Sequence, residues 1–487
     1  MTKFTTASTA SRAWSLREVL VLSAIAGAAG YATDDWIAMP AMVILWLAWK
    51  YLRDNDGLPI LSMAMTFQWV QVTVGIGYFA ATGRRLATMD ISDYRPMVLI
   101  GLGCVASLIV GLSAGINIMR RAKPPKEAER RATVPIGWPG LLILYFGILA
   151  LQGSIQEVAH QFPEFTQAIL AFKFVHLALL FIILRRLSQP VLRWPLIAVL
   201  VTWEVVLGVS GFFAGFREPL VMAVVALSEI FNPRRPQHWI ALTAFGVAMF
   251  GISLMWVSVK TGYRREFDDE TFAQSKSAQI NRMATLSTGW WQDHDVSKDA
   301  DKLVDRMWVV YYPALAVSRV PSVWPHTDGS IMWQALQHIL NPRVFFPTKV
   351  ELQSDSEMVR KYSGVWVASA DTGTSIAFGY AAESYIDFGL PWMFIPVFLY
   401  GMLAGLTYEI LSQRIRYDEL RAGLLAVIFW LALYLFERSW VKTLGLFGTL
   451  VIYLGCPALM LDYHLSRRQS VGAEPDSESH PLHQWSR

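Results

Sequence analysis

The 487-residue sequence has little charge: Asp, Glu, Lys and Arg together make up only 16% of it, whereas 54% of its residues are hydrophobic. A soluble globular domain carries roughly 25% charged residues. This shortage of charge argues against a soluble enzyme and predicts an all-α polytopic membrane protein. The 20 Trp and 17 Tyr fit that class, because their amphipathic rings settle at membrane–water interfaces.

Cysteine and the common catalytic motifs are also scarce. Cys104 and Cys456 both lie in apolar runs, which predicts small core residues and neither a disulfide framework nor a metal site. His160, His326 and His338 have no metal-ligand spacing to another His or Cys. The sequence lacks a phosphate-binding glycine loop, a nucleophile elbow and an HExxH pair, which argues against an ATPase or a zinc protease. We therefore expect no cofactor and no nucleic-acid partner.

Long apolar stretches are abundant, and a bilayer crossing needs about 17–25 residues. We predict about twelve transmembrane helices, at residues 16–33, 36–52, 58–82, 95–119, 136–153, 165–185, 191–211, 217–232, 238–260, 389–411, 420–438 and 442–462. The N-terminus has no small-residue cleavage site after a short apolar stretch, so the first helix is predicted to span the membrane. The tail 464–487 is polar and is predicted to be disordered and cytoplasmic.

The placement of Lys and Arg orients these helices, because cytoplasmic loops are enriched in both. The segment 120–131, RRAKPPKEAERR, is the most basic loop and is predicted to be cytoplasmic. By alternation both termini and four further basic loops lie on the same side, and the loop 82–95 is the one mild exception. Both termini are therefore predicted to be cytoplasmic, with Arg217 on the outside.

One long segment interrupts the helices. Residues 261–388 lie between the ninth and tenth predicted spans, so the chain divides into helices 1–9 (1–260), a large periplasmic inserted loop with short helices, and helices 10–12 (389–463). Apolar spacing predicts one helix over 301–321 and an amphipathic one over 328–340. An ordered loop of this length is usually functional.

Several outer Arg and Lys residues are candidate anion ligands. The stretch GFFAGFREPL places Arg217 and Glu218 in a glycine-broken gap between two apolar runs. Charge at a membrane edge is costly and usually functional, and a helix N-terminus with a guanidinium fork suits an anion. The alternative is that Arg217 pairs with Glu218 or snorkels to the interface. Five further outer cations suit a diphosphate or an acidic sugar: Arg264, Arg265, Arg306, Arg343 and Lys349. The alternative for each is a surface residue that is solvated or paired with an acidic side chain.

The segment that leads into the tenth predicted span supplies carboxylates. Glu383 and Asp387 are four residues apart, hence on one face of a helix. A carboxylate there can accept a proton from a sugar hydroxyl, while Tyr385 and Trp366 can hold sugar rings. The alternative for Glu383 is a capping or structural role, and His326 is the second candidate proton acceptor.

The motifs of this outer region resemble those of the oligosaccharide repeat-unit polymerases, the (Wzy-type) O-antigen and exopolysaccharide polymerases of bacterial envelopes. The resemblance covers about residues 200–410. The family pattern is Pro-Arg, Pro-x-Lys, Ser/Thr and then Glu-x-Tyr-x-x-Phe-Gly before a span, matched here by Pro342-Arg343, Pro347-Thr348-Lys349, Thr374-Ser375 and Glu383-Ser384-Tyr385-Ile386-Asp387-Phe388-Gly389. Family members often show Arg-Gly where this chain has Arg217-Glu218.

The resemblance implies a glycosyltransferase of the bacterial inner membrane. Such an enzyme moves sugars from undecaprenyl diphosphate to the free end of another lipid-linked repeat, at the periplasmic face. Cationic side chains can stabilise a diphosphate leaving group without a metal. Our hypothesis assigns catalysis to Glu383, Arg217 and Arg343, and substrate binding to Arg264, Arg265, Arg306, Lys349, Tyr385, Trp366 and His326. The lipid bilayer and a polysaccharide chain-length regulator are the expected further partners.

Three alternatives stay open. An O-antigen ligase-like transferase shares the chemistry and differs in its acceptor. A lipid-linked oligosaccharide flippase or polysaccharide exporter also suits twelve spans, although the chain shows no internal repeat and gathers its charge at the outer face. A non-catalytic assembly partner that only binds glycan intermediates is the third.

Overall fold

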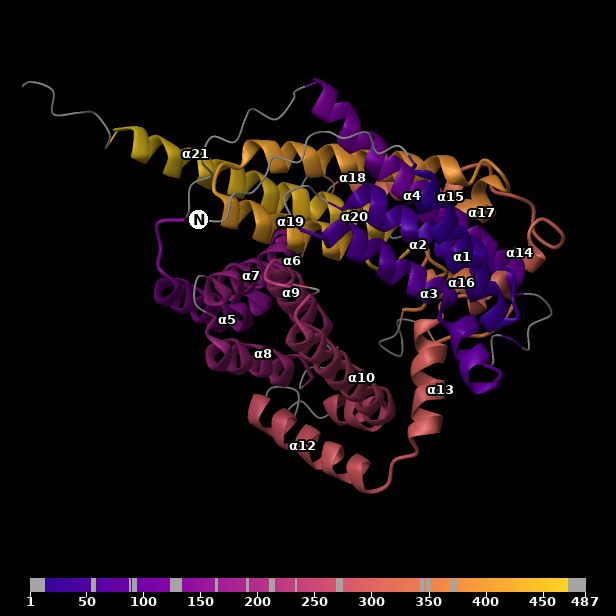
Figure 1. Ribbon diagram of the computed structural model, residues 1–487, viewed down its shortest axis with the longest axis horizontal. Helices are drawn as coiled ribbons and strands as arrows, with labels where there is room; N and C mark the ends of the chain where they lie inside the picture. Colours follow the sequence, from indigo (N-terminus) through magenta and orange to yellow (C-terminus); the bar gives the residue numbers. More distant parts are fainter. Residues whose placement is uncertain are drawn as a thin grey trace, which may run out of the picture.

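The computed structural model is helical (Figure 1). It describes residues 14–53, 58–86, 89, 94–122, 134–162, 165–189, 192–209, 215–232, 234–268, 275–341, 346, 352–368 and 375–471, without the side chains of 153–161, 466 and 468–471. No β-strand occurs in these ranges. The prediction of an all-α fold is confirmed to this extent, and the apolar helices support a membrane protein.

In the part of the chain that the structure describes, seven helical segments are long and apolar enough to cross a membrane: α1 (Leu16–Thr33), α3 (Ile60–Thr82), α4 (Arg95–Ala122), α6 (Thr166–Lys173) with α7 (Val175–Ser188), α10 (Pro236–Arg265), α18 (Phe394–Arg414), and Trp440–Leu465. The last comprises α20 (Trp440–Leu450), η5 (Val451–Gly455) and most of α21 (Cys456–Val471). Three helices have shorter apolar parts: α2 (Ala38–Leu52), α5 (Trp138–Gln161) and α8 (Trp194–Val209).

Two of the predicted spans are the short helices α9 (Arg217–Ser228) and α19 (Asp418–Leu433), of 12 and 16 residues. At about 1.5 Å per residue they cover roughly 18–24 Å, less than the ~30 Å hydrocarbon core. Each of the twelve predicted stretches overlaps a helix, while twelve complete crossings stay a prediction.

Glycines bring α4 and α18 into backbone contact. Gly111 and Gly115 of α4 face Gly401 and Gly405 of α18, and a Cβ on Gly115 would lie 2.2 Å from the carbonyl oxygen of Met402. Both helices thus carry glycines four residues apart, the spacing that lets apolar helices approach closely within a membrane.

The two helices run in the same direction. At one end the Ser107 hydroxyl donates a hydrogen bond to the carbonyl of Phe394 at 2.9 Å. At the other end Arg120 pairs with Glu409 at 3.0 Å. The starts of α4 and α18 therefore share one side of the molecule, as the predicted alternation requires.

The chain between α10 and α18 forms short helices: the 3-10 turn Glu266–Asp268, α12 (Lys276–Gln292), α13 (Val296–Met307), α14 (Tyr311–Arg319), α15 (Ser330–Leu340), α16 (Asp355–Ser363) and α17 (Tyr380–Phe388). In Figure 1, α14 to α17 gather at one end of the long helices and α21 lies at the other. We call residues 311–388 the outer subdomain. It has a small apolar core of its own, made by Ala316, Val320, Val359, Tyr362, Val367, Phe378, Ala382 and Ile386.

The prediction of a single helix over 301–321 is wrong, because the helical conformation is interrupted between α13 and α14. There Trp308 is buried, and its indole N–H donates to the carbonyl of Val72 at 2.9 Å. Its ring fills the space beside Gly75, where a Cβ would lie 2.2 Å away. Docking on α3 thus interrupts the helical pattern, whereas the helix predicted over 328–340 is confirmed as α15.

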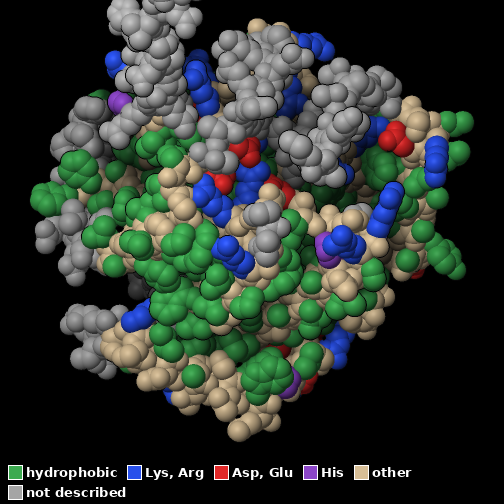
Figure 2. Space-filling model, turned by 60° about the vertical axis from the view of Figure 1, so that its left-hand side comes forward, with side chains coloured by type: hydrophobic (Ala, Val, Ile, Leu, Met, Phe, Trp, Pro, Cys, Tyr) green, Lys and Arg blue, Asp and Glu red, His purple; other side chains and the backbone are tan. Residues whose placement is uncertain are grey.

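The surface around α10 is apolar. Only Leu254, Trp256 and Tyr263 are buried in this helix, while residues such as Ile240 and Val247 are exposed. Figure 2 shows hydrophobic side chains over most of the lower part of one face, with most Lys and Arg side chains above them. An exposed apolar area of this kind suits contact with lipid.

Candidate functional site

The site is built on a break between the last two apolar segments. Every residue of α19 from Arg421 to Leu433 is buried, which places this helix at the centre of the core. The chain then leaves the helical conformation over residues 434–439, which we call the connector, and resumes as α20. Backbone groups freed by such a break need polar partners inside the molecule.

Two glutamines of α3 supply some of these partners. The side chain of Gln71 donates to the carbonyl of Tyr434 at 2.8 Å and accepts the N–H of Phe436 at 3.2 Å. Gln68 donates to the last carbonyl of α19 and accepts the hydroxyl of Tyr380 at 2.6 Å. These bonds fix the shape of the connector from one side.

Helix α17 fixes it from the other side. Glu383 accepts the backbone N–H of Trp440 at 2.7 Å, and Ser384 accepts its indole N–H at 2.9 Å. The N–H of Tyr380 donates to the carbonyl of Arg438 at 2.8 Å. Glu383 therefore caps the first turn of α20, where a carboxylate also meets the positive end of the helix dipole.

Burial governs the chemistry of Glu383. The residue is only 5% exposed, and loss of solvation raises the pKa of its carboxyl to about 8, although the Trp440 N–H acts in the opposite direction. Its neighbour Asp387 is also buried and accepts the N–H groups of Ile331 and Met332 at 3.0 and 2.8 Å. Both side chains therefore lie on α17, and each caps the first turn of another helix: Glu383 that of α20 and Asp387 that of α15.

On the connector, Glu437 holds the guanidinium of Arg306. Both terminal nitrogens of Arg306 donate to the carboxylate, at 2.8 and 3.0 Å. The negative charge of Glu437 raises the pKa of Arg306. The Arg306 side chain is 58% exposed and that of Glu437 28%, so the pair is accessible from outside.

Two more cations reach Arg306 from α10, which packs on α13. Lys260 and Arg264 are one helical turn apart, and the charges of both interact with that of Arg306. Like charges repel one another, so this arrangement costs free energy unless an anion is close.

The first residue of the connector, Tyr434, contacts the Arg217–Glu218 pair at the start of α9. The hydroxyl of Tyr434 donates to Glu218 at 3.1 Å. The charges of Arg217 and Arg438 both act on Tyr434, and the Arg438 guanidinium lies 5.7 Å from the centre of its ring. Arg217 itself is exposed at the start of α9.

These side chains form a cationic cluster, by which we mean Lys260, Arg264, Arg306, Arg217 and Arg438. Among the described residues, Glu437 is bound to Arg306 and Glu218 to Tyr434, so five cations gather with two carboxylates. Guanidinium and ammonium groups in excess suit a phosphate or diphosphate. In the described part of the chain no group of His, Cys, Asp or Glu residues could hold a metal.

The structure thus brings together three of the predicted ligands, Arg217, Arg264 and Arg306. Arg265 is exposed in the last turn of α10. Arg343 and Lys349, which the sequence also proposes, lie outside the described residues.

The predicted sugar-binding residues belong to the outer subdomain. A ring nitrogen of His326 lies 3.1 Å from the carbonyl of Tyr385, and the Tyr385 hydroxyl donates to the carbonyl of Val320 at 3.2 Å. Trp366 is 74% exposed, with the guanidinium of Arg360 at 5.2 Å from its ring. His326 and Tyr385 therefore make structural contacts, whereas the Trp366 ring is open to solvent.

Sequence reasoning missed Tyr434, Glu437, Arg438 and Lys260. The sequence does carry a signal for this site, because an adjacent Glu and Arg separate two apolar runs at residues 437–438, as the Arg and Glu at 217–218 also do. Only the Arg–Glu pair at 217–218 is predicted to be a site from the sequence.

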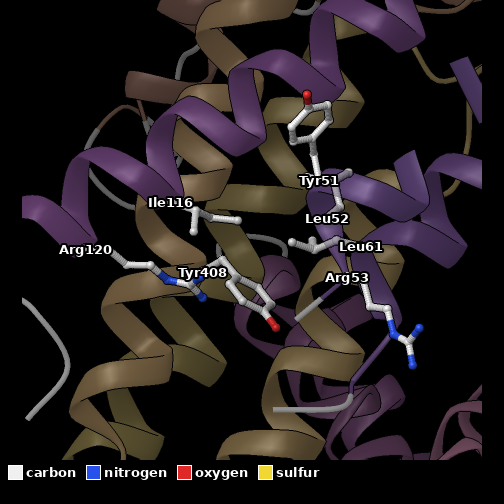
Figure 3. Close-up of a pocket in the computed structure, with 7 residues that line it drawn as sticks. All are labelled: Tyr51, Leu52, Arg53, Leu61, Ile116, Arg120 and Tyr408. Atoms are coloured by element: carbon white, nitrogen blue, oxygen red, sulfur yellow. The ribbon is translucent and has the colours of Figure 1, made fainter. Parts of the chain in front are cut away.

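One small pocket lies elsewhere, lined by Tyr51, Leu52, Arg53, Leu61, Ile116, Arg120 and Tyr408 (Figure 3). It is at the end of α4, whereas the start of α4 is near the cluster, because the Tyr94 ring there lies 5.3 Å from that of Trp308. The length of α4 puts the pocket on the order of 35 Å from that contact, so it is not part of the cationic site.

Comparison with known proteins gives a family. Neither a curated protein nor a solved structure matches the chain. A family model described as a domain of unknown function, DUF8712, matches residues 102–413. That range includes α9, α10, α13 and the outer subdomain, and ends before the connector. Because the match covers well over half of the sequence, the chain belongs to the DUF8712 family.

Proposed function

We propose that this protein is a membrane glycosyltransferase that polymerises undecaprenyl-diphosphate-linked oligosaccharide repeat units into O-antigen or exopolysaccharide. The observation that carries the proposal is the cationic cluster. Among the described residues it gathers five cations from α9, α10, α13 and the connector with two carboxylates. A lipid diphosphate is a membrane-borne anion that such a cluster would bind.

The chemistry needs this excess of positive charge. In the transfer the bond between the anomeric carbon and the diphosphate oxygen breaks, and negative charge develops on the leaving group. Preorganised cations stabilise that charge most effectively away from bulk water. Arg306 supplies a bidentate fork, and Lys260 and Arg264 add charge beside it.

The proposed setting is the bacterial inner membrane, with twelve spans, both termini in the cytoplasm and the outer subdomain in the periplasm. The parallel course of α4 and α18 agrees with the proposed alternation, in which both helices run from outside to inside. The charge gathers where the helices of the core give way to the outer subdomain. This favours a transferase over a flippase, which would carry charged side chains through its helix centres.

The test uses the purified full chain in detergent with a synthetic lipid-diphosphate repeat unit, without nucleotide sugar or ATP. We expect a ladder of products spaced by one repeat. Arg306→Gln should slow it about 100-fold, because one preorganised donor to the developing charge is lost. Arg282→Gln is the matched control. Arg282 lies in α12, pairs with Glu266 at 2.6 Å, and has a side chain about as exposed as that of Arg306.

The outcomes separate the alternatives. An undiminished ladder from Arg306→Gln would remove the cluster from the reaction. One transfer to a different acceptor, without a ladder, would indicate a ligase-like enzyme. Movement of the lipid across liposome leaflets without a new glycosidic bond would indicate a flippase.

A further inference from the structure

Glu437 occupies the position that a diphosphate would need. Both terminal nitrogens of Arg306 are bound to its carboxylate, at 2.8 and 3.0 Å. The same fork binds two oxygens of a phosphate with similar geometry. An incoming diphosphate must therefore compete with Glu437 for Arg306.

The surroundings favour the exchange. A carboxylate brings one negative charge to Arg306, whereas a diphosphate brings at least two, and Lys260 and Arg264 also act on this point. The Glu437 side chain is 28% exposed, so once released it has access to solvent and to a second substrate. The exchange therefore leaves a mobile carboxylate next to the bound donor.

The other carboxylates nearby have different partners. Glu383 is 5% exposed and holds the N–H of Trp440. Glu218 accepts the hydroxyl of Tyr434. Neither is bound to Arg306, whereas Glu437 is, so among these three carboxylates it is Glu437 whose state depends on the donor.

We propose that a bound diphosphate displaces Glu437 from Arg306, and that the released carboxylate accepts the proton of the acceptor sugar hydroxyl. This inference rests on the proposed function. The acceptor oxygen forms a bond to the anomeric carbon, while the electron pair of the old C–O bond leaves with the diphosphate. The hydroxyl proton passes to Glu437 and then to water.

The displacement of Glu437 sets the order in which the donor binds and the acceptor is activated. While both oxygens of the Glu437 carboxylate are bound in the fork of Arg306, they are not available to a sugar hydroxyl. The base is therefore released only when a donor occupies the cluster, which couples activation of the acceptor to the presence of the leaving group.

The first test is binding of geranyl diphosphate to the full chain in detergent, by isothermal titration calorimetry. Glu437→Gln should bind it about 10-fold more tightly than wild type, because the internal competitor is weakened. Arg306→Gln should lose binding. The matched control is Glu18→Gln, since Glu18 pairs with Lys50 at 3.0 Å at 38% exposure in α1. Unchanged or weaker binding by Glu437→Gln would overturn the displacement.

The second test is the rate of repeat-unit transfer. Glu437→Gln should be at least 100-fold slower despite its tighter binding, in the range expected for loss of a general base. Formate should partly restore Glu437→Ala. A Glu437→Gln enzyme that polymerises at the wild-type rate would overturn the role of the base. A wild-type protein that binds geranyl diphosphate but forms no ladder would instead refute the proposed function, while the binding comparison still decides the displacement.

Discussion

Glu383 accepts a hydrogen bond from the backbone N–H of Trp440 at 2.7 Å, across 57 positions of the sequence. This bond joins the last helix of the outer subdomain to the first turn of the final apolar segment. It also holds one end of the connector that carries Glu437 and Arg438. The carboxylate that the sequence offers as a catalytic base thus stabilises the part of the chain on which the cationic cluster is built.

This burial predicts a pH-dependent stability. Loss of solvation raises the pKa of Glu383 from its ordinary value of about 4.5 to about 8. Between these values the folded protein keeps a proton that the unfolded chain has released, so stability falls as the pH rises through this window. The side chain of a Glu383→Gln variant can still accept the Trp440 N–H. We expect its Tm to decrease less than that of the wild type from pH 5 to pH 9.

The control is Glu357→Gln, because Glu357 is also a capping side chain but is exposed. Its Tm should follow the wild-type pH dependence. A wild-type Tm that does not change between pH 5 and pH 9 would contradict the assignment.

The contact between α4 and α18 predicts a large effect of one methyl group. A Cβ on Gly405 would lie 2.2 Å from the carbonyl oxygen of Leu112, whereas Gly77 of α3 has no atom within 4 Å of that position. Gly405→Ala should lower the free energy of unfolding by about 1–3 kcal/mol through overpacking. Gly77→Ala should instead stabilise by about 0.5–1 kcal/mol, the usual gain in a helix. Denaturation in detergent would measure both, and equal effects would argue against the glycine contact.

The connector depends on Gln71. A Gln71→Leu variant leaves the carbonyl of Tyr434 and the N–H of Phe436 without this partner in a buried place. Each unsatisfied group costs about 1–3 kcal/mol, so we expect a clear loss of thermal stability and of diphosphate binding together. Gln334→Leu, at an exposed position of α15, should change neither. Normal binding by a folded Gln71→Leu protein would show that the connector need not be fixed.

Tyr434 and Glu218 should be energetically coupled, because the phenol donates to the carboxylate at 3.1 Å. Tyr434→Phe should cost about 1.5–3 kcal/mol, the range for a hydrogen bond to a charged group. In a Glu218→Gln background the same change should cost less. A double-mutant cycle of unfolding free energies measures the coupling, and strictly additive effects would mean that the contact contributes nothing.

Local composition determined much of the fold. Each predicted apolar stretch overlaps a helix, since a long apolar segment must satisfy its backbone hydrogen bonds internally. The amphipathic spacing of α15 was sufficient to predict it. The two cysteines are free, but the prediction of a small core residue is wrong for Cys456, which is exposed, and holds for Cys104, which is buried.

Tertiary structure alone decided the rest. The break at Trp308 cannot be read from its own segment, because the cause is the space that Gly75 leaves on α3. The role of Glu383 as a cap depends on Trp440, which the fold brings beside it. The sequence could propose Arg217 and Arg306 as cations, but only packing of distant helices against the connector places them around Tyr434 and Glu437, because electrostatic energy depends on distance in space and not on separation along the chain.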